Sequence, residues 1–214
     1  MVNNMKIGKV INLKDFSFVF ILLKQNKIII ISLILFLSGF IFGIFTPEKY
    51  EGFNNFFDAV LKDFFNLRNK GDIFDISVDA FGFYLNILIT VFIIGTSVLG
   101  VVFLPFILCA YGLYYGALLS ILYSEYSLNG VVLSGVVILP SAVLFAVCLI
   151  YATREAADFS VSISALTLPK SVPASLYYNF KKYCGEFIKI LSLTIIASLM
   201  DGFLSFYLIE KFTI

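Results

Sequence analysis

The sequence predicts an all-α protein, a polytopic membrane helix bundle of about five transmembrane helices, and two observations carry that prediction. Hydrophobic residues fill 60% of the 214 positions and charged residues only 14%, against roughly 25% charged in soluble domains. Residues 80–124 contain no charged side chain, and this run is about twice the 20 residues that one helix needs to cross a bilayer. A soluble domain of this size could not cover so much apolar surface, so we expect the chain in a membrane.

The uncharged stretches set the order of the spans. The first lies between Lys27 and Glu48 and is 20 residues long, and we expect it to stay in the protein as an anchor. The long run at 80–124 has to fold back once, and the bend is expected near Pro105. The fifth stretch is interrupted only by Asp201. The predicted spans are 28–47, 80–102, 105–124, 131–151 and 190–209, in one transmembrane domain over 28–214 behind an N-terminal segment, 1–27.

Charge gives the orientation, because Lys and Arg accumulate on the cytoplasmic side of short loops. The N-terminal segment carries five lysines and one acid, so we expect it in the cytoplasm. An odd number of spans then places residues 48–79, with four basic and seven acidic side chains, outside. The C-terminus is also expected outside, in a multi-pass protein of the cell membrane.

Two segments between the spans are predicted to be more than connectors. Residues 53–68 place apolar side chains at the three- and four-residue spacing of an extracytoplasmic amphipathic helix. This helix either lies in the headgroup region or against the bundle, or it is a docking face for an extracytoplasmic partner. The docking candidates are Phe53, Phe56, Phe57 and Phe64. Residues 156–186 contain Pro169 and Pro173, and we expect them to extend span four into the cytoplasm and then to form a second, interfacial helix.

Small residues recur at helical spacing within the spans, which lets helices approach closely in lipid. The glycines assigned to such packing are Gly39, Gly43, Gly112, Gly116 and Gly202. They serve either internal packing of the bundle or contacts between copies.

Asp201 is expected near the middle of the membrane, because it lies about 11 residues, or roughly 16 Å, into the fifth span. A carboxylate at that depth should face the bundle and have a partner or be protonated. The same depth estimate predicts a polar layer of Asp201, Asn86, Thr90, Tyr114, Tyr115 and Ser141. Pro140 is expected to kink span four. The layer either fixes helix register through hydrogen bonds or conducts protons or cations.

Composition argues against catalysis. The chain has no His, which excludes His-based metal sites and Ser-His or Cys-His catalysis. Its three cysteines form no CxxC pair and are interpreted as small buried hydrophobic residues. We therefore predict no enzyme, no metal and no cofactor, and no basic tract indicates nucleic acid.

Three stretches give the chain a resemblance to the stage II sporulation protein M family of integral membrane proteins: YGLYYG at 111–116, LSGVVILP at 133–140 and ASLMDGFLS at 197–205. The resemblance implies a small helix bundle that, in spore formers, anchors secreted cell-wall hydrolases to the membrane during engulfment. A large branch of that family carries His-Gly-x-x-Glu directly after the proline of span four. Here Pro140 is followed by Ser-Ala-Val-Leu-Phe, so intramembrane chemistry inferred for that branch does not transfer.

Two functions remain open at this point. The first is a non-enzymatic scaffold whose partners, besides the lipid bilayer, are cell-wall-remodelling proteins, and which could also form homo-oligomers. The alternative is a small transporter or channel subunit that uses the polar layer around Asp201.

Overall fold

The computed structural model describes residues 27–46, 71–166 and 176–209, and nearly all of these residues are helical. The helices are α2 (Lys27–Phe45), α4 (Ile73–Gly95), α5 (Gly100–Leu133), α6 (Leu139–Leu166) and α7 (Leu176–Ile209), with a π-helical turn, η1 (Ser134–Ile138), between α5 and α6. Five stretches within them are long and apolar enough to cross a membrane: Ile28–Phe45, Ile73–Gly95, Gly100–Ser124, Tyr126–Ser164 and Asn179–Tyr207. The predicted class, an all-helical membrane bundle, is therefore confirmed for the part of the chain that the structure describes.

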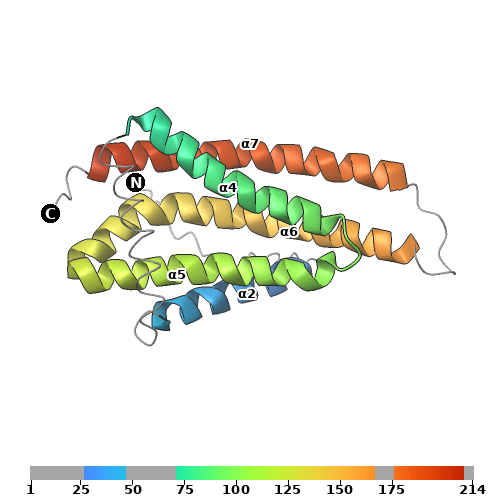
Figure 1. The fold of residues 1–214 in the computed structure, drawn as a ribbon, viewed down its shortest axis with the longest axis horizontal. Coiled ribbons are helices and arrows are strands. Elements are labelled where there is room, and N and C mark those ends of the chain that lie inside the picture. Colours follow the sequence, from blue (N-terminus) through green and yellow to red (C-terminus); the bar gives the residue numbers. More distant parts are fainter. Residues whose placement is uncertain (1–26, 47–70, 167–175, 210–214) are drawn as a thin grey trace, which may run out of the picture.

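The helices lie side by side in one bundle (Figure 1). We call its two ends the Asp72 end and the turn end. The Asp72 end holds the start of α4, the ends of α2 and α7, and the reversal from α5 to α6. The turn end holds the connection at 96–99 between α4 and α5, the end of α6 and the start of α7. α2 packs chiefly on α5, while α7 packs on α4 and α6.

The core lies where α4, α5, α6 and α7 meet. Fully buried side chains come from all four of these helices, with Val91 on α4, Leu108 on α5, Phe145 on α6 and Ala197 on α7. A smaller cluster around Leu118 and Leu122 closes the Asp72 end, between the two arms of the α5–α6 hairpin. Packing of these buried side chains therefore helps to hold the helices together.

The bend between the second and third spans was predicted at Pro105, and the structure corrects this to residues 96–99. The backbone amides of Thr96 and Ser97 bond back to carbonyls of the last turn of α4, at 3.1 and 3.0 Å. From α6, the hydroxyl of Ser160 donates to the carbonyl of Ser97 at 2.6 Å. Pro105 lies inside α5, where its missing N–H removes one hydrogen bond without ending the helix. Short polar side chains, rather than proline, fix the bend.

The reversal between α5 and α6 is at Ser127, between the predicted third and fourth spans. Ser127 has φ 52° and ψ −132°. Among the described residues, it is the one residue other than glycine with a positive φ. That backbone conformation is strained for a residue with a side chain. At Gly130 an added Cβ would overlap the carbonyl oxygen of Leu122, so the missing side chain lets the two arms of the hairpin close.

A π-helical turn, Ser134–Ile138, ends two residues before Pro140 in the structure. Pro140 has no N–H to donate to the preceding turn, and widening the helix there is one way to redistribute the carbonyls that lose their donor. The sequence predicted a kink at Pro140, and it did not predict this π-helical turn.

The segment 156–186 differs in part from its prediction. α6 does extend beyond the fourth span, to Leu166, but no separate interfacial helix follows it among the described residues. α7 instead begins at Leu176 and runs without interruption to Ile209. The reason is the packing face, because the buried positions Tyr183 and Ile190 continue the same helical side as the buried residues farther along.

Candidate functional site

Asp201 lies in the interior of the bundle, where it contacts α6. Its exposed fraction is 3%, and that of Ser141 is 1%. The Ser141 hydroxyl lies 3.0 Å from Oδ1 of Asp201 and also 3.0 Å from the carbonyl oxygen of Ile138 in the π turn. A serine hydroxyl has one hydrogen to donate, so these two acceptors compete for it. The irregular turn before Pro140 and the buried acid are thus connected through one side chain.

Along the bundle, Asp201 lies nearer the Asp72 end than the middle of α4 does. An added Cβ at the next residue, Gly202, would overlap the Ser77 hydroxyl, and Ser77 is in the second turn of α4. The middle of α4 is at Tyr84, whose ring stacks on Phe145. Phe145 is four residues, or about 6 Å along the axis, beyond Ser141. The membrane depth expected for Asp201 stays a prediction.

Asp201 belongs to a stripe of buried polar residues on α7. These residues are Thr194, Ser198, Asp201 and Ser205, and spacings of four, three and four keep them on one side of the helix. Thr194 and Ser198 each donate to a carbonyl of the preceding turn, at 2.9 and 2.8 Å. Together with Ser134 of η1 and Ser141 of α6, which are also buried, they form what we call the polar seam between α6 and α7.

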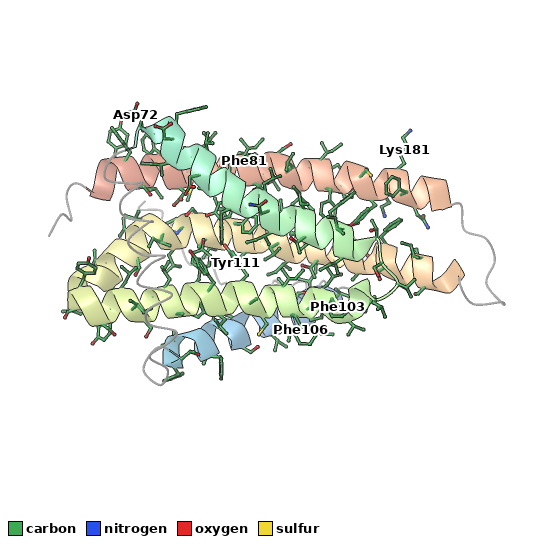
Figure 2. The ribbon with its side chains drawn as sticks, viewed as in Figure 1. Asp72, Phe81, Phe103, Phe106, Tyr111 and Lys181 are labelled. Carbon is green, nitrogen blue, oxygen red and sulfur yellow. The ribbon has the colours of Figure 1, made fainter. Side chains whose placement is uncertain are left out.

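Next to the polar seam, aromatic side chains connect α4, α5 and α6. The rings of Tyr84 and Phe145 stack with centroids 4.2 Å apart, and Tyr111 meets Phe145 edge-on at 5.3 Å. Tyr111 projects from α5 toward α6 (Figure 2), and its hydroxyl donates to the carbonyl of Ala142 at 3.2 Å. Tyr115 packs on Tyr111 with centroids 4.8 Å apart. This aromatic layer holds three helices in a fixed arrangement.

The predicted polar layer is brought together only in part. Ser141 contacts Asp201, Tyr115 joins the aromatic layer, and Tyr114 packs on Phe83 of α4 with centroids 5.4 Å apart. Asn86 and Thr90, in contrast, are exposed on the outer side of α4. A depth estimate gives the height of a residue along the bundle but not the side of the helix on which it lies, and this is why these two were misplaced.

Two tyrosines of the aromatic layer, Tyr84 and Tyr111, are not among the residues that the depth estimate selects. Tyr111 lies four residues before the predicted Tyr115, on the same side of the helix. Ser198 and Ser205 lie three residues before and four residues after Asp201, and this spacing likewise places them on the helix face of Asp201. Both sets could have been found by asking which residues share a helix face with a predicted one.

The predicted packing glycines lie where helices approach within this one chain. An added Cβ would overlap a facing carbonyl oxygen at four of them: Gly39 with Cys109, Gly43 with Leu113, Gly112 with Phe36 and Gly116 with Phe40. These four pairs show α2 and α5 running in the same direction, backbone against backbone. Such an approach admits Cα–H···O contacts, which are typical of small-residue helix interfaces in membranes.

Some of the sequence predictions lie outside the described residues, among them Phe53, Phe56, Phe57 and Phe64 of the outer amphipathic helix. Within the described ranges, no group of three or more His, Cys, Asp or Glu is arranged to hold a metal ion. The three cysteines, at 109, 148 and 184, are free thiols.

Comparison with known proteins gives one match. A family model described as Stage II sporulation protein M covers residues 32–206. No curated protein and no solved structure matches the chain.

Proposed function

Because the chain belongs to the stage II sporulation protein M family, we propose that it is a non-enzymatic membrane scaffold that anchors cell-wall-remodelling proteins at the outer face of the membrane, as in engulfment. The observation that carries the proposal is the family match itself, which reaches into all five described helices. The chain is a multi-pass membrane protein, which is compatible with a role as an anchor.

The use of the buried polar groups supports a structural role. Ser141 bonds to Asp201 across α6 and α7, Tyr111 bonds to a carbonyl of α6, and Tyr183 of α7 donates to the carbonyl of Phe92 on α4 at 2.9 Å. Each of these contacts holds one helix against another. Groups that are engaged in this way stabilise one arrangement of the bundle, which suits a platform for other proteins.

Charge supports an orientation with the Asp72 end outside. Three acids open α4 and three basic residues lie toward the turn end, and Figure 2 labels one of each at opposite ends of the bundle. The acids are Asp72, Asp75 and Asp79, and the basic residues are Arg154, Lys181 and Lys182. Because Lys and Arg accumulate on the cytoplasmic side, the turn end is the cytoplasmic one in this proposal. The predicted outer amphipathic helix, 53–68, then precedes α4 on the outside.

The alternative function, a transporter or channel subunit, has the buried Asp201 in its favour. A cavity of ≈ 200 Å³ lies between α2, α5 and α6, but its lining does not include Asp201. That lining is aromatic and aliphatic apart from Ser134 and the tyrosine hydroxyls. A pathway for ions or protons needs polar groups along its length, so the scaffold is the better supported of the two functions.

Co-purification in mild detergent tests the scaffold. Cell-wall hydrolases should remain bound to the wild-type chain and be lost when Phe56, Phe57 and Phe64 are replaced by Ser. Asp201→Asn is the matched control, because it keeps the size of the side chain and an acceptor for Ser141, and it should leave the complex intact. Cellular activity that survives the Phe changes but is abolished by Asp201→Asn would instead favour the transporter.

A further inference from the structure

An outward-facing set of polar residues on α4 takes part in none of the helix contacts described above. These residues are all exposed, and we call them the α4 polar stripe: Asp75, Asp79, Asn86 and Thr90. Spacings of four, seven and four residues return to one side of a helix with 3.6 residues per turn. The buried side of α4, which carries Tyr84, faces nearly the opposite way.

The stripe lies at a depth where lipid would otherwise surround the helix. α4 has 23 residues, which is about 34 Å, so a hydrocarbon core of roughly 30 Å takes up nearly its whole length. Asn86 is close to the middle of α4, and Asp79 is in its second turn. Wherever the bilayer lies along α4, a spanning α4 therefore has Asn86 in the hydrocarbon core. Asp79 is then inside that core or at its edge. Polar side chains at such depths almost always face protein or water rather than lipid.

Nothing in the described part of the chain covers this stripe. The Thr90 hydroxyl donates to the carbonyl of Asn86 at 2.8 Å, within α4 itself. The side chains of Asp75, Asp79 and Asn86 form no hydrogen bond or ion pair with the described residues of other helices. Gly82 lies between them on the same side, and a Cβ added there would have no atom within 4 Å. As far as the described residues go, the face is open, and its glycine permits close approach of another helix.

Charge indicates what would cover the stripe. A second copy docked face to face would set Asp75 and Asp79 against the same two residues, and like charges repel strongly where water is scarce. Described basic residues such as Lys181 lie toward the turn end (Figure 2), so they offer a second copy no partner at this level. A separate helix with a basic side chain near the Asp72 end complements the carboxylates directly.

We propose that the α4 polar stripe is the docking face for a transmembrane helix of a partner protein. That helix carries a Lys or Arg level with Asp75 and Asp79, and an amide or hydroxyl about two turns deeper, level with Asn86. The basic group pairs with the carboxylates, and the deeper polar group hydrogen-bonds to the amide of Asn86. The proposal rests on the scaffold function and deepens it, because it gives the anchored protein a contact inside the membrane.

Defined probe helices test this docking face in lipid vesicles that hold the purified full-length chain. The probe is a single-span Leu/Ala peptide with one Lys near the end that inserts on the Asp72 side, and matched peptides carry Leu or Glu there. Association is measured by energy transfer from a donor on the chain to an acceptor on the peptide. We expect the Lys peptide to associate about tenfold or more tightly than the Leu peptide, as one desolvated charge pair can provide.

Variants of the chain localise the effect. Asp79→Asn should remove the preference for the Lys peptide over the Leu peptide. Asn86→Leu should weaken the association of a second Lys peptide, which also carries Asn two turns deeper. Ile196→Ala, on the exposed face of α7, is the matched control and should change nothing. Asp79→Lys should bind the Glu peptide instead of the Lys peptide, and this exchange cannot come from misfolding.

Equal association of the Lys, Leu and Glu peptides would overturn the proposal. Energy transfer between two differently labelled copies of the chain that Asp79→Asn and Asn86→Leu abolish would overturn it in favour of a second copy. The peptides have no extracytoplasmic domain, so their failure to bind leaves the co-purification result for the scaffold untouched. A failed co-purification, in turn, leaves a positive peptide result standing.

Discussion

The hydroxyl of Ser141 lies 3.0 Å from the carboxylate oxygen Oδ1 of Asp201, and this pair joins α6 to α7 immediately after the π turn. Because the same hydroxyl also lies 3.0 Å from the Ile138 carbonyl, the pair connects an irregular stretch of α6 with the polar seam on α7. In a lipid environment such a contact helps to select one register between two long helices.

Replacing Asp201 should separate the role of its oxygen from that of its charge. Asp201→Asn keeps an acceptor for Ser141, so we expect the free energy of unfolding in detergent to change by less than about 1 kcal/mol, whereas Asp201→Leu should lower it by about 1–3 kcal/mol. In the double variant with Ser141→Ala, the loss should be smaller than the sum of the single losses, because the two residues share one bond. Equal damage from Asn and Leu would contradict this account of the pair.

The α2–α5 interface should not tolerate a side chain on its glycines. Gly112→Ala places a Cβ against the carbonyl oxygen of Phe36, and overpacking of this kind costs about 1–3 kcal/mol. Gly185→Ala is the matched control, since its Cβ meets no atom within 4 Å, and it should stabilise α7 by roughly 0.5–1 kcal/mol. Thermal unfolding of the two variants measures both effects, and a neutral Gly112→Ala would mean that α2 is not held this closely.

Tyr183 anchors the start of α7 through two separable contacts. Its hydroxyl donates to the carbonyl of Phe92, and its ring stacks on Phe159 with centroids 4.5 Å apart. Tyr183→Phe should cost about 1 kcal/mol of unfolding free energy, the net value of one hydrogen bond, and Tyr183→Ala about 3–5 kcal/mol, as for other large buried rings. Tyr207→Phe, at an exposed site, should stay within about 0.5 kcal/mol. If Phe and Ala at 183 were equally damaging, the stacking contribution would be refuted.

The class of fold could be predicted from the sequence because charge-free runs report directly on the membrane. Element boundaries were harder, since they depend on tertiary contacts. The bend was placed at Pro105, whereas the hydroxyl of Ser160, 63 residues from its acceptor Ser97, helps to fix it at 96–99. The fifth span was predicted to begin only at residue 190, with a separate interfacial helix before it, yet α7 runs from Leu176 to Ile209 and its packing face continues throughout.

The candidate site could be predicted only in outline. Asp201 was singled out because a lone acid in an apolar run is costly, and its proximity to Ser141 followed from a depth estimate. The same estimate could not show that Asn86 faces outward, because the side of a helix that is buried depends on its neighbours. Counting the 3.6-residue period from Tyr84 would have separated the buried side of α4 from the stripe.

Orientation tests the central claim most directly, because a scaffold for extracytoplasmic proteins has to present its Asp72 end outside. In a chain whose three cysteines are replaced by Ser or Ala, Asp72→Cys and Lys62→Cys should react with a membrane-impermeant thiol reagent on intact cells. Lys181→Cys and Lys170→Cys should react only after permeabilisation. Labelling of Lys181→Cys but not of Asp72→Cys on intact cells would place the acidic end in the cytoplasm and contradict the scaffold proposed here.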